Sequence, residues 1–360
     1  MNRIVHRSSR FDFMRSVGIS TILLYNLPDY CFKSYRFHLF GTTVDLSQLH
    51  HLSLQCSLGL LVFLAGSLIN RHQLTFPNIQ TAGKFLFKKL AKLFPLYYLS
   101  LALFCYLYSM LDWGQILIHV LGLQLIFASD GYPPLPTLWY VGLISVYYSL
   151  FSLLNIEKIP TLYKAAILGG VLLTLFLSAT YLNITDMRLI CYSLPFIGGI
   201  LAAKKNWFEG RIWRKVLSLN RGVFLAFLPL CWLWEKKYSL GIEHNTILLN
   251  LLMFSFVLLI YRLSDVVCQN SRLNRLFHTI AYCAYGMFLF HRPIWFALEQ
   301  MMRSLLLIDN IYTITAGLVF LGIPLIVGVS YVLLTLYDRY GITAWYHPKT
   351  LIRSPKFYRQ

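Results

Sequence analysis

Two polar side chains bracket the first apolar stretch of the chain, RSVGISTILLYN, which runs from Arg15 to Asn26. An α-helix turns about 100° per residue, so Asn26 returns almost to the azimuth of Arg15, about 16 Å further along. A guanidinium and an amide on one helix face are typical of a polar interior rather than a lipid-facing surface. A simpler interpretation remains open, in which Arg15 is a basic flank that sets orientation and Asn26 ends the helix.

Two histidines inside apolar stretches are candidates for proton transfer, because imidazole titrates near neutral pH. His291 lies in the stretch AYGMFLFHRP at 284–293 and is the first candidate, beside Arg292 and Pro293. His119 is the second. The alternative for each is a hydrogen-bonded packing residue. The seven cysteines are scattered without a CxxC spacing, so we expect small core residues and no metal site.

A basic segment and a tryptophan segment carry further candidates. Lys88, Lys89 and Lys92 precede an apolar run and suit a phosphate of a ligand, although membrane topology alone also explains their charges. Trp139 and Tyr148 lie on a later apolar run, where Trp139 suits either a binding site or an interfacial anchor.

These residues are embedded in a strongly apolar chain. Of the 360 residues, 57% are hydrophobic and 13% are charged, and the mean hydropathy is +0.59. This composition predicts an all-α polytopic membrane protein, and runs near 20 residues long exclude a β-barrel. The net charge of +18 lies mainly in short loops, so we expect no nucleic-acid binding.

Eleven apolar runs are candidate spans. They lie near 13–27, 51–70, 93–111, 113–129, 137–154, 163–182, 187–203, 221–235, 245–263, 277–299 and 312–337. Both termini are basic and belong in the cytoplasm, so the number of crossings must be even.

The run at 113–129 is the one that we expect not to cross, because it carries Gln115, His119 and Gln124. Such polar groups suit a re-entrant or half-helix. The prediction is therefore about ten crossings in a single membrane domain, 1–360. Its membrane part covers 11–337, and a basic cytoplasmic tail follows at 338–360.

Four stretches, taken in order, resemble acyltransferase family 3 over about residues 11 to 337. They are the Arg15-to-Asn26 helix, 62–71 with 87–98, 135–148 and 284–293. The resemblance implies transfer of an acyl group, often acetyl, from cytoplasmic acyl-coenzyme A to a carbohydrate or lipid-linked glycan of the cell envelope. It implies no bound cofactor, with acyl-coenzyme A as donor substrate.

The resemblance also implies site residues. Arg15, Asn26 and His291 are the implied catalytic residues. The implied substrate or acyl-coenzyme A contacts are Lys88, Lys89, Lys92, Trp139, Tyr148 and Tyr285.

The sequence departs from the family pattern at chemically important positions. Asn26 stands where the family has histidine, and an amide cannot take a proton near neutral pH. Ile144 and Ser145 stand where the family has carboxylates. Three functions therefore remain open: a divergent acyltransferase with another base, a chemically inactive relative that exports or flips a glycan, and a structural partner in polysaccharide assembly.

Overall fold

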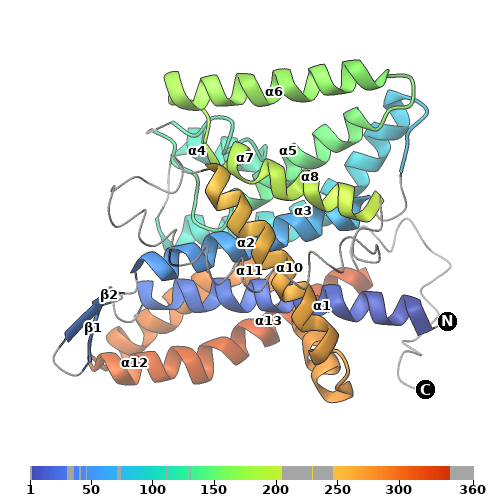
Figure 1. The fold of residues 1–360 in the computed structure, drawn as a ribbon. Coiled ribbons are helices and arrows are strands. Elements are labelled where there is room, and N and C mark those ends of the chain that lie inside the picture. The colour runs from blue at the N-terminus through green and yellow to red at the C-terminus, as the bar shows by residue number, and fades with distance from the viewer. Residues whose placement is uncertain are drawn as a thin grey trace.

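The computed structural model describes residues 2–30, 36–39, 42–45, 47–70, 74–109, 112–129, 131–204, 229 and 246–340. Most of them form helices (Figure 1). The helices are α1 Asn2–Asn26, α2 Ser47–Ile69, α3 Ile79–Leu107, α4 Trp113–Val120, α5 Trp139–Leu154, α6 Thr161–Tyr181, α7 Arg188–Cys191, α8 Ser193–Lys204, α10 Thr246–Val267, α11 Ser271–Gln300, α12 Ile311–Gly317 and α13 Ile323–Tyr340.

A short antiparallel hairpin departs from the expected all-α fold. Strand β1, Arg36–Leu39, pairs with β2, Thr42–Asp45, so that Arg36 lies opposite Asp45. The hairpin follows α1 and precedes α2. Thr42, Thr43 and Val44 are β-branched and favour an extended backbone. Two strands of four residues are too short to show as a periodic pattern in the sequence.

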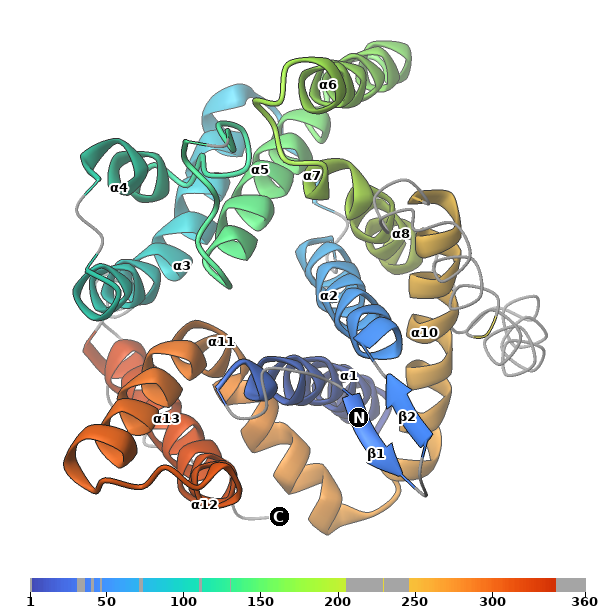
Figure 2. The same cartoon turned by 90° about the vertical axis from the view of Figure 1, so that its left-hand side faces the viewer.

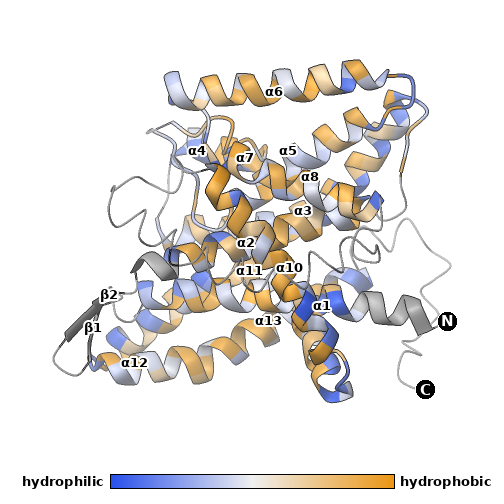
Figure 3. Cartoon of the chain, viewed as in Figure 1, coloured by the Kyte–Doolittle hydropathy of each residue, from blue (hydrophilic) through white to orange (hydrophobic). Residues whose placement is uncertain are grey.

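Five helical segments among the described residues are long and apolar enough to cross a membrane. They are His51–Ile69, Ile79–Leu107, Thr161–Tyr181, Thr246–Val267 and Ile311–Tyr340. Helix α6 is the clearest, because it is strongly apolar (Figure 3) and yet none of its 21 residues is buried. An exposed apolar surface of this extent belongs in lipid, so the chain is a membrane protein.

Of the six other expected spans, the runs at 13–27, 137–154 and 277–299 lie largely within the single helices α1, α5 and α11, and the structure describes none of the other three as a single long helix. The run at 113–129 forms only the eight-residue α4 followed by turns, which is too short to cross a bilayer. The run at 187–203 divides into α7 and α8. The run at 221–235 lies outside the described residues except for position 229. The total of about ten crossings stays a prediction.

Helices α1, α2 and α11 form the centre of the molecule. Helix α1 packs against both α2 and α11, and α11 packs in turn against α13. Figure 2 shows α1 and α2 nearly end-on at the centre and α6 at the periphery. Helices α1 and α11 carry charged residues along with apolar ones, so the most polar long helices are central. This arrangement gives their polar groups protein partners instead of lipid.

Two glycines allow α2 and α8 to touch through their backbones. A Cβ on Gly66 would lie 2.1 Å from the carbonyl oxygen of Phe196, and a Cβ on Gly199 would lie 2.1 Å from that of Phe63. Small residues allow this close packing between membrane helices. At the end of the contact, the Asn70 amide donates to the carbonyl of Ile200 at 3.2 Å.

Candidate functional site

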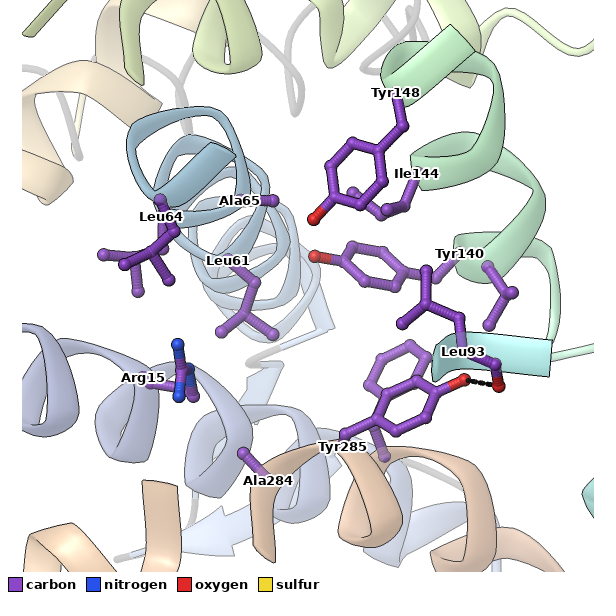
Figure 4. A pocket seen from close by; sticks show the side chains of 13 residues that line it. Arg15, Leu61, Leu64, Ala65, Leu93, Tyr140, Ile144, Tyr148, Ala284 and Tyr285 are labelled. Atoms are coloured by element: carbon purple, nitrogen blue, oxygen red, sulfur yellow. Dashed lines mark hydrogen bonds between the residues drawn. The ribbon is translucent and has the colours of Figure 1, made fainter. Parts of the chain in front are cut away.

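A cavity of about 210 Å³ lies between α1, α2, α3, α5 and α11, and we call it the Arg15 cavity (Figure 4). Its lining is mostly apolar: Arg15, Leu61, Leu64, Ala65, Leu68, Leu93, Tyr140, Val141, Ile144, Tyr148, Ala284, Tyr285 and Phe288. The sequence-predicted residues Arg15, Tyr148 and Tyr285 therefore come together here from three separate helices.

Arg15 forms no hydrogen bond or ion pair with any described residue, whereas its charged neighbours on α1 are paired. Arg10 lies 2.7 Å from a carboxylate oxygen of Asp265 on α10, and Asp12 lies 2.9 Å from Nδ1 of His278 on α11. A partly buried, unpaired guanidinium is costly unless a ligand supplies the negative charge. Arg15 is therefore the group in this cavity best suited to an anion.

Tyrosine hydroxyls supply the other polar groups of the Arg15 cavity. Those of Tyr140 and Tyr148 both point into it from α5, and that of Tyr285 donates to the carbonyl of Leu93 at 2.7 Å (Figure 4). Our sequence reasoning missed Tyr140. Tyr140, Ile144 and Tyr148 follow one another at intervals of four residues. This spacing was the available signal, because i and i+4 residues share a helix face.

A second cavity of about 280 Å³ lies at the other end of the Arg15-to-Asn26 stripe, and we call it the Asn26 cavity. Polar and aromatic side chains form much of its wall. Its lining is Ile22, Tyr25, Asn26, Leu54, Leu58, Pro134, Pro136, Thr137, Trp139, Arg188, Phe288 and Arg292. The predicted residues Asn26 and Trp139 therefore share this cavity.

Asn26 is buried, and both its amide nitrogen and its side-chain oxygen are hydrogen-bonded. Its amide donates to the carbonyl of Ile22 at 2.8 Å, and its Oδ1 accepts from Nη2 of Arg292. The same Nη2 lies 3.0 Å from a carboxylate oxygen of Asp29, one turn beyond Asn26. The Nε of Arg292 is buried and has no hydrogen-bond partner among the described residues. Arg292 thus brings a positive charge to the wall of this cavity, a role that our sequence reasoning did not assign to it.

The ring of Trp139 is covered by the cationic side chain of Arg188. The Arg188 guanidinium lies 4.5 Å from the ring centroid, a cation–π arrangement. Asp186 fixes this guanidinium, accepting from its Nε at 2.8 Å. The ring of Tyr192 stacks on Trp139 with centroids 5.9 Å apart. The tryptophan is therefore a buried wall of the cavity, rather than an exposed interfacial anchor.

His119 holds the loop that brings Trp139 into place. Its Nε2 accepts from the backbone N–H of Leu135 at 3.0 Å, so its Nδ1 carries the proton donated to the carbonyl of Gln115 at 2.8 Å. In the same loop Thr137 has a φ of 66°, a strained backbone for a β-branched residue. With both ring nitrogens engaged, His119 is a positioning residue for the loop.

Phe288 of α11 lines both cavities. Its ring lies 4.9 Å from that of Tyr140, centroid to centroid. The two cavities therefore meet at a single aromatic side chain, with Arg15 on one side and Asn26 on the other.

Comparison with known families identifies the family of the chain. A family model described as an acyltransferase domain matches residues 9–335, which is most of the chain. The chain belongs to acyltransferase family 3. The comparisons with curated proteins and with solved structures gave no match. This member of acyltransferase family 3 has the amide side chain of Asn26 in the lining of one of its two cavities.

Other residues predicted from the acyltransferase family 3 resemblance line neither cavity. His291 is fully buried on α11; its Nδ1 lies 3.0 Å from the carbonyl oxygen of Met287, and its Nε2 has no partner among the described residues. Lys88, Lys89 and Lys92 lie on α3, just before the lining residue Leu93.

The chemistry of this acyltransferase family 3 member is limited by what lines its cavities. Among the described lining residues there is no carboxylate and no imidazole. The described part of the chain also holds no group of three or more histidine, cysteine, aspartate or glutamate side chains that could bind a metal. The arrangement can bind anions and hydrogen-bond acceptors through arginine, and polar ligands through amide and hydroxyl groups.

Proposed function

We propose that the protein transfers an acyl group, acetyl in the simplest case, from acyl-coenzyme A to a hydroxyl group of a carbohydrate or lipid-linked glycan. Membership of acyltransferase family 3 supports the reaction class. The observation that carries the proposal is the pair of cavities that meet at Phe288. Two sites in contact allow a donor and an acceptor from different compartments to react without mixing their solutions.

The donor belongs at the Arg15 cavity. The unpaired Arg15 guanidinium suits a phosphate of coenzyme A, because arginine donates to phosphate in a two-pronged geometry. Lys88, Lys89 and Lys92 precede Leu93 of the cavity wall and add positive charge on α3. Tyr148 and Tyr285 supply the aromatic part of the wall.

The acceptor belongs at the Asn26 cavity. Trp139 and Thr137 form one side of it and Arg292 another. Hydroxyl-rich ligands need several donors and acceptors in fixed places, and the hydroxyl groups of Tyr25 and Thr137 lie in this lining. Asn26, tied to Ile22 and Arg292, orients this group and does not itself remove a proton.

The orientation in the cell membrane follows from the donor. Acyl-coenzyme A is cytoplasmic, so the Arg15 end of α1 faces the cytoplasm together with both chain termini, in agreement with the basic loops. The Asn26 end then faces the outer side, where a lipid-linked glycan is available. The partners are membrane lipid and the glycan acceptor.

The decisive test is label transfer by purified protein in lipid nanodiscs. Protein supplied with labelled acetyl-coenzyme A and membrane glycan is expected to produce labelled glycan and free coenzyme A. The Arg15→Met variant is expected to lose transfer. Wild-type protein that binds acetyl-coenzyme A but never labels glycan contradicts the proposal.

A second function is favoured by one observation. The described lining of both cavities lacks any carboxylate or imidazole. Such a lining suits a protein that moves a glycan across the membrane and does not catalyse acyl transfer. In that case the glycan crosses the membrane of reconstituted vesicles with no consumption of acyl-coenzyme A. Measuring both products in the same vesicles separates the two functions.

A further inference from the structure

Acyl transfer to a hydroxyl needs an acceptor for the hydroxyl proton, and Asn26 cannot be that acceptor. Four histidines have side chains that the structure describes: His51, His119, His278 and His291. His119 has both ring nitrogens engaged. His291 lines neither cavity, and His278 is paired with Asp12 near the start of α1.

His51 is the described histidine that hydrogen-bonds a cavity-lining side chain. Its Nδ1 lies 3.4 Å from the hydroxyl oxygen of Tyr25, with the ring centroids 6.5 Å apart. Tyr25 lines the Asn26 cavity and directly precedes Asn26 on α1. His51 lies near the start of α2, so neighbouring helices present the pair.

We infer that Tyr25 and His51 form the proton relay of this protein and replace the histidine that the family has at position 26. The inference rests on the proposed acyl transfer. Tyr25 contacts the acceptor hydroxyl as the catalytic residue, and His51 acts through Tyr25. The 3.4 Å separation is long for a hydrogen bond, and catalytic hydrogen bonds commonly shorten when substrate binds.

The relay balances the reaction. The acceptor hydroxyl gives its proton to Oη of Tyr25, while the proton of Tyr25 moves to the unprotonated Nδ1 of His51. The hydroxyl oxygen forms its bond to the thioester carbonyl carbon, and the carbon–sulfur bond breaks. The coenzyme A thiolate leaves and is neutralised by the proton released from His51. The products are one ester and one thiol.

Arg292 supplies the positive charge of this site. Negative charge develops on the thioester carbonyl oxygen as the hydroxyl attacks, and a preorganised donor stabilises it. Arg292 lines the same cavity as Tyr25 and brings its guanidinium charge to it. In this arrangement Asn26 holds the guanidinium in place through Oδ1.

The test compares variants of the full-length protein in nanodiscs, with acetyl-coenzyme A and membrane glycan. Tyr25→Phe and His51→Ala are expected to lower kcat by about 10²–10⁴-fold, the usual contribution of general base catalysis, with KM for acetyl-coenzyme A nearly unchanged. Added imidazole is expected to restore transfer by His51→Ala, because it fills the vacated space and accepts the proton. A purely structural histidine would not give this rescue.

Controls separate this inference from the proposed function. His278→Ala removes a described histidine outside both cavities and is expected to keep its kcat with and without imidazole. An active wild type whose Tyr25→Phe variant is equally active overturns the relay alone, as does failure of imidazole to rescue a folded His51→Ala variant. A wild type that binds acetyl-coenzyme A and transfers nothing overturns the proposed function, and the relay with it.

Discussion

The guanidinium of Arg292 on α11 donates a hydrogen bond to the side-chain oxygen of Asn26 on α1, across 266 positions of sequence. This contact gives a chemical reason for an amide at position 26. A permanently charged donor needs an acceptor, and a protonated imidazole at the same place would face a like charge. Asparagine supplies this acceptor at every pH, whereas an imidazole supplies it only while it is unprotonated.

Removal of this acceptor is expected to destabilise the protein. Asn26→Ala removes a hydrogen bond from the charged, partly buried guanidinium of Arg292, typically about 1.5–3 kcal/mol, while Asn26→Asp keeps an acceptor and is expected to retain stability. Thermal unfolding in detergent measures the difference. Asn250→Ala is the matched control, because the buried Asn250 likewise donates to the carbonyl four residues earlier, at 2.7 Å, whereas its Oδ1 has no partner among the described residues. Equal melting temperatures for Asn26→Ala and wild type would contradict the expectation.

Arg15 is expected to contribute to coenzyme A binding and not to the stability of the fold. Arg15→Met removes an unpaired cation from the Arg15 cavity, so the melting temperature should stay the same or rise. Loss of a charge-assisted contact of about 1.5–3 kcal/mol should weaken coenzyme A binding about 10- to 150-fold. Calorimetric titration measures this. Arg303→Met is the control, since Arg303 pairs with Glu299 outside both cavities; equal affinities for both variants would refute a donor role for Arg15.

Phe288 is expected to control passage between the cavities. Phe288→Trp adds bulk where they meet, and displacement of reacting groups by about 1 Å can cost about 10²-fold in rate. We expect transfer to fall by this order while coenzyme A still binds. Phe290→Trp overfills the same helix at a buried residue that lines neither cavity, and serves as the control for overpacking. The expectation is wrong if both variants lose transfer to the same degree at equal stability.

His119 is expected to matter for the shape of the Asn26 cavity. His119→Ala leaves the buried N–H of Leu135 without its acceptor, at a cost of about 1–3 kcal/mol. The loop at 131–138 should then be cleaved faster in limited proteolysis. His278→Ala, at an exposed position, should leave cleavage of that loop unchanged. A loop that stays equally protected in His119→Ala would show that other contacts hold it.

The glycine contact of α2 and α8 is expected to be required for folding. A side chain on Gly199 would meet the carbonyl oxygen of Phe63 at 2.1 Å, so Gly199→Leu must separate the helices and should abolish the monodisperse protein peak. Gly169→Leu on α6 places its Cβ where no atom of the described residues lies within 4 Å, and it should behave as wild type. Size-exclusion chromatography of the two variants tests the contact. Normal behaviour of Gly199→Leu would mean that α2 and α8 tolerate separation.

The amino-acid sequence by itself determined those features that depend on local pattern. Hydropathy predicted a helical membrane protein, helical periodicity placed Arg15 and Asn26 on one face, and polar side chains within 113–129 predicted a segment that does not span. The ordered stretches were enough to indicate the family. Each of these rests on residues close together in the chain, where helix geometry alone relates the side chains.

Only the tertiary structure decided which of these faces meet. The contact of Arg292 with Asn26, the pairing of Tyr25 with His51 and the two cavities that share Phe288 depend on how each helix is rotated about its axis. Apolar membrane helices pack through close shape fit, and a pattern of small residues shows which helix face can approach a neighbour but not which neighbour it meets. For the same reason His291 was a strong candidate by sequence, although its neighbour Arg292 is the one that lines the Asn26 cavity.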